Sequence, residues 1–514
     1  MQARIGLLKR RELPSSSSLK RFTRRSEMET AARTGSVQLF LLICVFVVLL
    51  GPAATAGEPI DIGSRRELFV DDHLIDSMDG VRLLLNRPQP AGKVLAFDKP
   101  WEGNTSLYVT VFEDDGRYRM YYRGSAHPDY VVQSMVRPDE AIPKDHPQLT
   151  VYAESQDGMT WTKPSLGLFE FEGSKQNNIL WMGEGAHNFA PFKDTNPDAP
   201  PSERYKALAG GPLLALKSAD GIHWERMQEE PVISDGKFDS QNVAFWDEVR
   251  QHYVSVYRDF RYGVRTIKTA TSKNFIHWTP GEWADYGDAP PEHMYTNATV
   301  PYFRAPQLYL SFPKRLQPFR TKVNDGKNNG LSDGVFMSSR DGVHWYRFVE
   351  GFIRPGRDER NWIHRTNAVS RGIIQTAPDE LSLYVARHYT YPSAHIERMT
   401  LRMDGFVSAN AGYPGGELVT KPVIFSGDRM YLNYATSGAG SIRIEFQNEK
   451  GQALPGFSLE ESPVLYGDEI DGEVAWPRPD TRTDRAPLRR ISGQAVKIRF
   501  VMRDADLYAF RFGE

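Results

Sequence analysis

The heptapeptide Ser155-Gln-Asp157-Gly158-Met-Thr-Trp161 decides the fold, because the chain repeats it. In such a turn an Asp side chain accepts hydrogen bonds from backbone N–H groups, and Gly adopts positive φ without strain. The Trp that follows can pack between neighbouring repeats. We therefore expect the Asp and Trp residues of this motif to have structural roles. The further copies, of which the last two are degenerate, are 218–224, 339–345, 272–278 and Asp404-Gly405-Phe406.

The repeat has the length of one propeller blade. Its Trp residues are 63, 54 and 67 residues apart, and Phe406 follows after another 61. A segment that alternates at period two precedes each copy, as is typical of a half-buried strand; these segments are 117–123, 204–208, 252–258, 307–312 and 380–385. Five strands and five motif positions predict an all-β fold with a five-bladed β-propeller over residues 57–406. We expect residues 66–71 to form the N-terminal strand that closes the ring.

The repeat ends near residue 407. Strand-like segments without the Trp turn follow to the end of the chain, and they predict a separate β-sandwich over residues 407–514. No constellation of carboxylates or histidines stands out in this region, so we expect it to be a packing partner for the propeller.

Residues 1–56 have the pattern of a signal peptide. Basic residues precede the apolar run 37–50, and Ala54-Thr55-Ala56 follows as a cleavage site. Cleavage after Ala56 predicts a secreted or periplasmic protein without a membrane anchor, and an uncleaved N-terminal anchor is the alternative. The only cysteine, Cys44, lies in this run, so the exported body has no disulfide.

The charge of the exported body argues against nucleic acid as a partner. The first 56 residues carry nine Lys/Arg and three acidic residues, so the rest of the chain has a formal net charge of −8.

The organisation resembles that of a known enzyme group. Five blades followed by a β-sandwich is the plan of glycoside hydrolase family 32, and its propeller is shared with family 43. The repeated turn is similar to the Ser-x-Asp-x-x-x-Trp turns of those families, and Arg258-Asp259-Phe260 resembles the Arg-Asp-Pro of family 32. The nucleophile motif Asn-Asp-Pro-Asn-Gly and the Glu-Cys acid of that family have no match here. The resemblance implies the fold and a carbohydrate ligand, and it does not carry a reaction.

The phase of the strands predicts which residues line the mouth of the central channel. The first strand of each blade begins at the face where the second strand ends, because the two strands are antiparallel. We expect two groups of polar residues at this rim. The carboxylates are Glu102, Asp239, Asp259 and Glu292, and the other residues are Asn104, Arg123, His187, Gln241, Asn242, Arg258, Tyr295, Asn297, Lys314, Arg315, Trp362, Arg365 and His388.

The four carboxylates are the catalytic candidates. Glycosidases place two carboxyl groups about 5 Å apart for retention or roughly 6.5–9.5 Å apart for inversion. A pair across the channel from Asp239, Asp259, Glu102 and Glu292 would satisfy this need, and a structural ion pair or a solvated loop position is the alternative for each. No tight His/Asp cluster predicts a metal ion, and no cofactor is expected.

The cations at the same rim point to the chemistry of the ligand. Arg123, Arg258, Lys314, Arg315 and Arg365 gather there although the body is acidic. They predict a glycan that carries carboxylate or sulfate groups. The sequence thus indicates a secreted glycosidase acting on a polysaccharide or oligosaccharide, and a non-catalytic carbohydrate-binding propeller is the alternative.

Overall fold

The computed structural model describes residues 58–323, 329–476 and 487–514. These residues form β-strands joined by turns, and their only helices are short 3₁₀ segments: η1 (Pro128–Tyr130), η2 (Gln133–Met135), η3 (Pro201–Glu203), η4 (Glu359–Asn361) and η5 (Pro487–Arg490). In this part of the chain no helix is long and apolar enough to cross a membrane. The signal peptide predicted over residues 1–56, with Cys44, lies outside the described residues.

Four antiparallel sheets of four strands follow one another along the chain. In each sheet the strands lie in chain order, so each strand pairs with the next strand of that sheet along the chain. The first sheet contains β6 (Leu107–Asp114), β7 (Arg117–Ala126), β8 (His146–Ser155) and β9 (Ile179–Met182). The second contains β10 (Ala190–Lys193), β11 (Tyr205–Gly210), β12 (Leu213–Ser218) and β13 (Glu225–Arg226). The third contains β14 (Val243–Asp247), β15 (His252–Arg261), β16 (Val264–Ser272) and β17 (Glu282–Trp283). The fourth contains β19 (Val300–Tyr302), β20 (Ala305–Ser311), β23 (Met337–Ser339) and β24 (Trp345–Arg347).

A small sheet extends the region of the fourth sheet. It has the order β18-β21-β22. Its strands are β18 (His293–Met294), β21 (Lys314–Gln317) and β22 (Leu331–Gly334).

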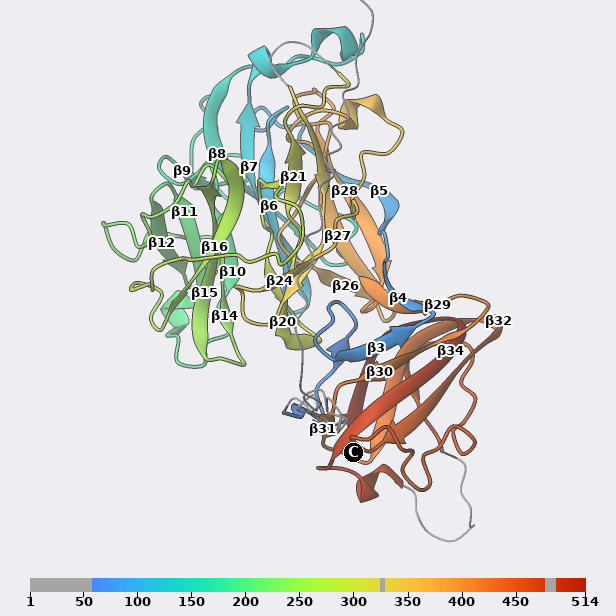
Figure 1. Ribbon diagram of the computed structural model, residues 1–514. Helices are drawn as coiled ribbons and strands as arrows, with labels where there is room; N and C mark the ends of the chain where they lie inside the picture. The colour runs from blue at the N-terminus through green and yellow to red at the C-terminus, as the bar shows by residue number, and fades with distance from the viewer. Residues whose placement is uncertain (1–57, 324–328, 477–486) are drawn as a thin grey trace, which may run out of the picture. The chain divides into compact units, whose positions relative to one another are not determined.

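The next sheet joins distant parts of the chain. It has the order β25-β27-β28-β5, and β26 also pairs with β27. Its strands are β5 (Gln89–Ala96), β25 (Ala368–Val369), β26 (Ile374–Ala377), β27 (Glu380–Arg387) and β28 (His395–Arg402). Figure 1 shows β5 in blue beside β28 in orange. The N-terminal segment therefore completes this sheet, as expected, but through a different strand from the one predicted.

The strand predicted to close the ring pairs elsewhere. Within residues 66–71, β2 (Glu67–Leu68) pairs with β34 (Ala495–Gly513) in a ten-stranded sheet. Glu67 is fully buried there and forms an ion pair with Arg340. The segment thus contains a strand, as predicted, but the strand it pairs with is a different one. The sequence pattern shows that a segment is extended and does not show which strand it pairs with.

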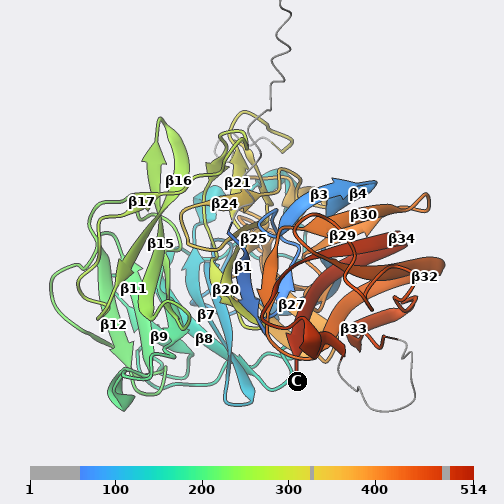
Figure 2. The ribbon, with the colours of Figure 1, turned by 60° about the horizontal axis from the view of Figure 1, so that its bottom comes forward.

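The ten-stranded sheet combines the two ends of the described chain. The long strands β32 (Arg429–Gln447) and β34 pair along most of their length, and N-terminal strands add to their edges. Figure 2 shows the blue strands β3 and β4 beside the orange strands β30 and β29. Residues 60–85 therefore belong with the C-terminal strands, although the sequence placed them with the propeller. The remaining strands are β1 (Ile60–Gly63), β3 (Ile75–Asp79), β4 (Val81–Leu85), β29 (Val407–Ala411), β30 (Gly416–Thr420), β31 (Val423–Phe425) and β33 (Asp468–Glu473).

The first strands of the successive sheets lie next to one another. β6 contacts both β10 and β25, β10 contacts β14, and β14 contacts β19. Arg371, which precedes β26, fixes this arrangement, because its guanidinium donates to the backbone oxygens of Pro191 and Ala244 in two other sheets. The protein is thus all-β with a propeller-like arrangement of antiparallel sheets. Apolar and aromatic side chains fill the space between sheets in several buried clusters.

The repeated turn has the expected structural role. In the first copy, Asp157 Oδ1 accepts hydrogen bonds from the backbone N–H groups of Met159 and Thr160, both at 2.7 Å. Gly158 has φ of 70°, and Trp161 packs edge-on against Tyr384 of the neighbouring sheet at 5.6 Å. The degenerate copy keeps this geometry, since Asn274 Oδ1 accepts the same pair of N–H groups.

We expect the Asp157→Ala variant to lose about 1 kcal/mol of stability at neutral pH, the usual cost of losing a side chain that accepts unpaired backbone N–H groups. The N–H groups of Thr160 and Met159 lower the pKa of Asp157 to about 2. Because this folded-state pKa lies below the ordinary value of about 4, the charge-dependent stabilisation is present above that value and is lost as the pH falls toward 2. Urea unfolding of wild type and Asp157→Ala at a series of pH values measures their difference in free energy of unfolding, which should become smaller as the pH falls. The control is Asp157→Asn, which keeps an oxygen that can accept the two backbone N–H groups, as Asn274 does. If Asp157→Asn lost as much stability as Asp157→Ala, the structural role assigned to this acceptor would be contradicted.

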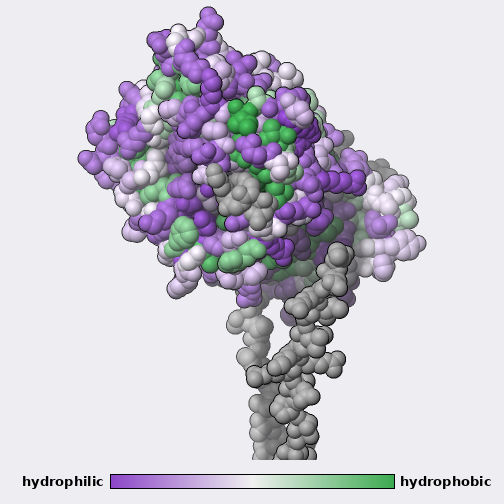
Figure 3. Space-filling model, turned by 90° about the horizontal axis from the view of Figure 1, so that it is seen from above, coloured by the Kyte–Doolittle hydropathy of each residue, from purple (hydrophilic) through white to green (hydrophobic). Residues whose placement is uncertain are grey.

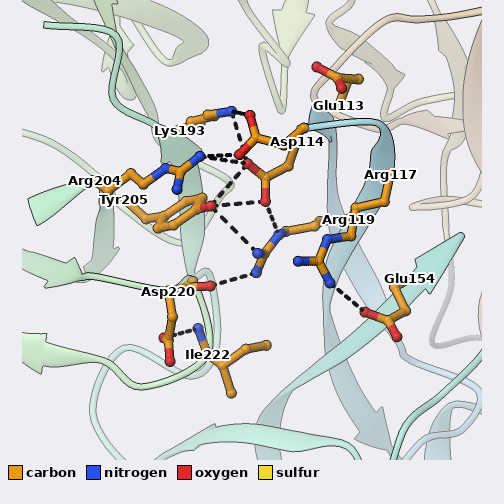
Figure 4. Close-up of polar contacts among 12 residues, drawn as sticks. Glu113, Asp114, Arg117, Arg119, Glu154, Lys193, Arg204, Tyr205, Asp220 and Ile222 are labelled. Atoms are coloured by element: carbon orange, nitrogen blue, oxygen red, sulfur yellow. Dashed lines mark hydrogen bonds and ion pairs between the residues drawn. The ribbon is translucent and has the colours of Figure 1, made fainter. Parts of the chain in front are cut away.

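A buried polar cluster holds the first and second sheets together. Asp114 at the end of β6 accepts a hydrogen bond from the Tyr205 hydroxyl of β11 at 2.9 Å and an ion pair from Lys193 of β10 at 3.0 Å. Arg119 of β7 also binds this carboxylate and donates to the backbone oxygen of Asp220 (Figure 4). The cluster therefore connects the turn motif of the second sheet to the first sheet.

Candidate functional site

A polar cavity of about 120 Å³ lies where five sheets meet. Each of the four four-stranded sheets, or the segment leading into it, contributes to its wall, and so does the sheet that contains β5. Its lining residues are Thr105, Leu107, Tyr108, Arg123, Ser125, His127, Tyr130, Gln148, His187, Asp239, Tyr295, Lys314, Arg365 and Tyr389. Six of these are residues that the strand phase predicts at the channel mouth. Hydrophilic side chains also dominate the face of the molecule seen in Figure 3, although smaller hydrophobic patches interrupt them.

The positions of these residues follow from the antiparallel sheets. His187, Asp239 and Arg365 each lie a few residues before the first strand of a sheet. Arg123 lies near the end of β7, and Lys314 follows the end of β20. First-strand starts and second-strand ends therefore meet at one cavity.

Asp239 is the only carboxylate among the described residues that line this cavity. It accepts hydrogen bonds from His187 Nε2 at 2.9 Å and from the Tyr295 hydroxyl at 3.3 Å, and Arg258 Nη2 lies 4.0 Å away. Burial alone would raise the pKa of Asp239, but the hydrogen bond from His187 and the positive charges of Arg258 and Arg123 lower it to about 2. Asp239 is therefore an ionised hydrogen-bond acceptor at neutral pH.

His187 joins Asp239 to the opposite wall of the cavity. Its Nδ1 lies 2.6 Å from Gln148 Oε1 and 3.3 Å from Arg123 Nη1. Burial lowers the pKa of His187, although the hydrogen bond to Asp239 opposes this shift. His187 thus links Asp239, through Nε2, to Gln148 and Arg123 on the other side of the cavity.

Three basic side chains at the cavity lack a carboxylate partner. Among the described residues, no carboxylate oxygen lies within 4.0 Å of Arg123, Lys314 or Arg365 in an ion pair. Arg123 instead donates to the backbone oxygen of Thr105 at 2.7 Å and stacks on the Tyr108 ring at 4.7 Å. Arg365 lies over the Tyr130 ring at 5.4 Å. A wall with two such guanidinium groups, one lysine and one carboxylate is suited to an anionic ligand.

Two of the lining residues have strained backbones. Tyr108 has φ of 56° and Arg365 has φ of 72°, in the left-handed region that non-glycine residues seldom occupy. Such conformations persist where the surrounding structure holds them, and they cluster at functional sites. The strain therefore agrees with a ligand site here.

The other predicted carboxylates lie away from the cavity and are held by cations. Glu102 is fully buried, binds Lys163 Nζ at 2.6 Å and accepts the Tyr122 hydroxyl. Asp259 forms an ion pair with Lys268 at 3.0 Å. Glu292 binds Arg315 at 3.2 Å. The predicted cross-channel pair thus has one member, Asp239, at this cavity.

Four of the predicted amides and cations support the rim from behind. The Asn104 side chain donates to the backbone oxygen of His127 and accepts the backbone N–H of the same residue. Gln241 donates to the backbone oxygen of Val109. Asn242 accepts the backbone N–H of Arg258, and Arg258 packs against the Tyr295 ring at 5.0 Å. These residues position the cavity wall without lining it.

The remaining predicted residues lie elsewhere. Asn297 donates to the backbone oxygen of Val256, and Arg315 is paired with Asp333. Trp362 donates to the backbone oxygen of Gly356. His388 lies between Ser393 and Asp358, and burial lowers its pKa to about 4. None of the four lines the polar cavity.

Of the four tyrosines that line the cavity, the sequence predicted Tyr295 and did not predict Tyr108, Tyr130 or Tyr389. Tyr389 directly follows the predicted His388, so extending the second-strand end by one residue would have found it. Tyr108 lies inside β6, and its positive φ, which the sequence does not reveal, goes with its place in the cavity wall. Tyr130 and Gln148 come from the connection between β7 and β8 and from the start of β8, which the strand argument did not consider.

A second cavity of about 690 Å³ lies beside the opposite ends of the same first strands. Aromatic residues such as Phe192, Trp246 and Phe303 line it, and none of the predicted site residues does. In the described part of the chain, no group of three or more His, Cys, Asp or Glu side chains is arranged to hold a metal ion.

Comparisons with known proteins find solved structures at low identity and with low TM-scores. No protein-family model and no curated protein sequence matches the chain. A solved glycoside hydrolase is 13% identical over 62% of this chain and 92% of its own, with a TM-score of 0.42. An N-acetylgalactosamine deacetylase from F. plautii, in complex with blood group B trisaccharide, is 10% identical over 63% and 96%, with a TM-score of 0.40. A β-1,2-mannobiose phosphorylase from Listeria innocua is 12% identical over 60% and 96%, with a TM-score of 0.39. Similarity at this level does not identify a reaction, so the function must be argued from the cavity.

Proposed function

We propose that the polar cavity binds an anionic sugar residue and that the protein cleaves the glycan that carries it. The observation that carries this proposal is the pair of arginines, Arg123 and Arg365, that line one cavity with a single carboxylate and form no ion pair with it. Guanidinium groups bind carboxylate and sulfate oxygens through paired, charge-assisted hydrogen bonds. The tyrosines of the same wall offer rings and hydroxyls to a sugar.

The ionised Asp239 fits the binding of sugar hydroxyls. With a pKa of about 2 it accepts hydrogen bonds at neutral pH and does not supply a proton. Because Glu102, Asp259 and Glu292 are ion-paired away from the cavity, we assign proton transfer to groups other than a pair of carboxylates.

The proposal also covers the architecture and the export that the sequence predicts. The four four-stranded sheets and the sheet that contains β5 and β28 would be the blades of a five-bladed β-propeller related to those of families 32 and 43. The ten-stranded sheet would be an accompanying β-sandwich. Residues 1–56 would direct export, so the glycan would be met outside the cytoplasm.

A non-catalytic glycan-binding protein is the second candidate. One carboxylate together with four tyrosines in the cavity favours this alternative, because binding needs no proton donor. The two candidates differ in whether the bound glycan is cut.

A panel of neutral, uronate-containing and sulfated oligosaccharides tests both candidates. We expect the purified protein to release new reducing ends from anionic members only, and to bind those members in calorimetry. Binding without new reducing ends would overturn the enzyme and support the alternative. Preference for neutral glycans, or no binding to any member, would overturn the anionic site.

We expect Arg365→Met to raise the KM for an anionic oligosaccharide about tenfold, because it removes one charge-assisted contact while Arg123 remains. Steady-state kinetics at constant ionic strength measures the change. Arg82→Met serves as the control, since Arg82 lies on β4 in the ten-stranded sheet and does not line the cavity. Equal KM values for Arg365→Met and wild type would contradict the assignment.

A further inference from the structure

Lys314 has an unusual setting for a lysine. Its side chain is completely buried, and its Nζ has no hydrogen-bond partner among the described residues. The amine lies 4.2 Å from the centre of the Tyr295 ring and lines the cavity. Burying an unpaired ammonium is expensive, so such a lysine tends to exist as the neutral amine.

The charges around Lys314 act in the same direction. The groups that surround its amine are Arg365, Arg123, Arg258, Asp239, His364 and Tyr295. Burial, and then the charges of Arg365 and Arg123, lower the pKa of Lys314 well below its usual value, and the single negative charge of Asp239 opposes them only in part. A neutral amine in this cavity is a base, not a cation.

A proton donor lies on the same wall. Arg123 Nη2 donates to the Tyr389 hydroxyl oxygen at 3.3 Å, so the phenol's own proton is free to point to another acceptor. Tyr295 differs, because its hydroxyl donates to Asp239. Of these two phenols, Tyr389 is therefore the one whose proton is available to a ligand.

These groups match the needs of β-elimination on a uronic acid. We propose, on the basis of the proposed function, that the protein is a lyase for 4-linked uronate glycans, with Arg123 and Arg365 on the sugar carboxylate, Lys314 as base and Tyr389 as acid. Arginines that neutralise the carboxylate make the hydrogen on the adjacent C5 acidic. The reaction needs no pair of carboxylic acids, in agreement with the single carboxylate at the cavity.

The reaction balances without a co-reactant. The Lys314 amine takes the C5 proton, and the electrons of the C5–H bond form a C4=C5 double bond. The bond from C4 to the bridging oxygen breaks, and Tyr389 protonates the leaving oxygen. Proton exchange with solvent then returns Lys314 to the amine and Tyr389 to the phenol. The products are a new reducing end and an unsaturated uronate.

The unsaturated product gives a specific signal. The test uses 4-linked oligomers of galacturonate, glucuronate, mannuronate and guluronate, with their methyl esters as controls that lack the charge. The ultraviolet absorbance of the conjugated double bond is followed together with new reducing ends. We expect wild type to produce both signals in equal amounts from at least one free acid, and neither from its ester.

Two variants test the assigned residues. We expect Lys314→Met to lower the rate of double-bond formation by about 10²–10⁴-fold, the usual contribution of a positioned base. Methionine fills the same buried space without a charge, so the melting temperature should be unchanged or higher. Tyr389→Phe should lower the rate in the same assay while keeping the ring. Binding of the oligomer in calorimetry should persist in both variants.

The outcomes separate this inference from the proposed function. Reducing ends without absorbance would overturn elimination and leave glycan cleavage standing. No reducing ends from any glycan, with or without uronate, would overturn both. Absorbance that persists at the wild-type rate in Lys314→Met would overturn the role of Lys314.

Discussion

The Asp404→Asn variant is expected to lose about 3 kcal/mol of stability, since removing one member of a buried ion pair leaves the other charge without compensation. Asp404 is fully buried and receives ion pairs from Arg66 at 3.3 Å and Arg304 at 3.0 Å. It also accepts hydrogen bonds from the Tyr302 hydroxyl at 2.6 Å and from Asn433 at 3.1 Å. Asparagine keeps the shape and tolerates the positive φ of this position, so the variant isolates the charge.

The matched control for this prediction is Asp471→Asn. Asp471 also pairs with Arg66, at 3.1 Å, but its side chain is 39% exposed. We expect its loss to cost under about 1 kcal/mol, because exposed pairs are weak. The shift of the urea unfolding midpoint measures both variants. Equal midpoint shifts for Asp404→Asn and Asp471→Asn would show that the buried ion pairs of Asp404 contribute no more to stability than the exposed pair of Asp471.

Replacing Asp239 by asparagine should lower kcat/KM for an anionic oligosaccharide by about 100-fold, the value of a charge-assisted hydrogen bond to a sugar hydroxyl. The substitution also replaces one of the two oxygens that accept hydrogen bonds from His187 and the Tyr295 hydroxyl by an NH2 group, which donates. Stability should change little, because the Asp239 side chain is 67% exposed. Steady-state kinetics of wild type and Asp239→Asn, on an anionic oligosaccharide that the panel shows to be cleaved, gives the ratio of their kcat/KM values.

An exposed aspartate in the same fold supplies the control for Asp239. Asp115 pairs with Lys193 at the surface and does not line the cavity. We expect Asp115→Asn to keep the wild-type kcat/KM. A wild-type value for Asp239→Asn as well would remove this carboxylate from the site.

The repeated turn made much of the fold predictable from sequence. Asp157 and its equivalents mark where one strand of each sheet ends, so the phase of the neighbouring strands follows by counting. That phase placed Asp239, Lys314 and Arg365 at one cavity although they are far apart in the chain. These predictions succeed because turn geometry and strand alternation are local properties.

The failures depend on long-range partners. The sequence made Glu102 a catalytic candidate, but in the fold Lys163 forms an ion pair with its carboxylate. No local sequence pattern predicts that pair. Residues 66–71 read correctly as an extended segment, but their partner β34 lies at the other end of the chain. Tyr108 enters the cavity wall from a left-handed backbone, which side-chain alternation does not foresee. Strand pairing, ion pairing and backbone strain depend on the complete fold, so a local sequence pattern does not reveal them.

The pairing of β5 with β28 also sets an order of events during folding. The ribosome makes β5 early and its partner about 300 residues later, so this contact is among the most non-local in the chain. Until β28 exists, one edge of β5 has unpaired N–H and C=O groups that other extended segments could occupy. The four four-stranded sheets pair their strands in chain order and can form as they are synthesised, whereas the ten-stranded sheet also needs the C-terminal strands. We therefore expect the joining of β5 and β28 to be a slow, late step in the folding of the region between residues 89 and 402, and the waiting β5 to need protection from aggregation while the chain grows.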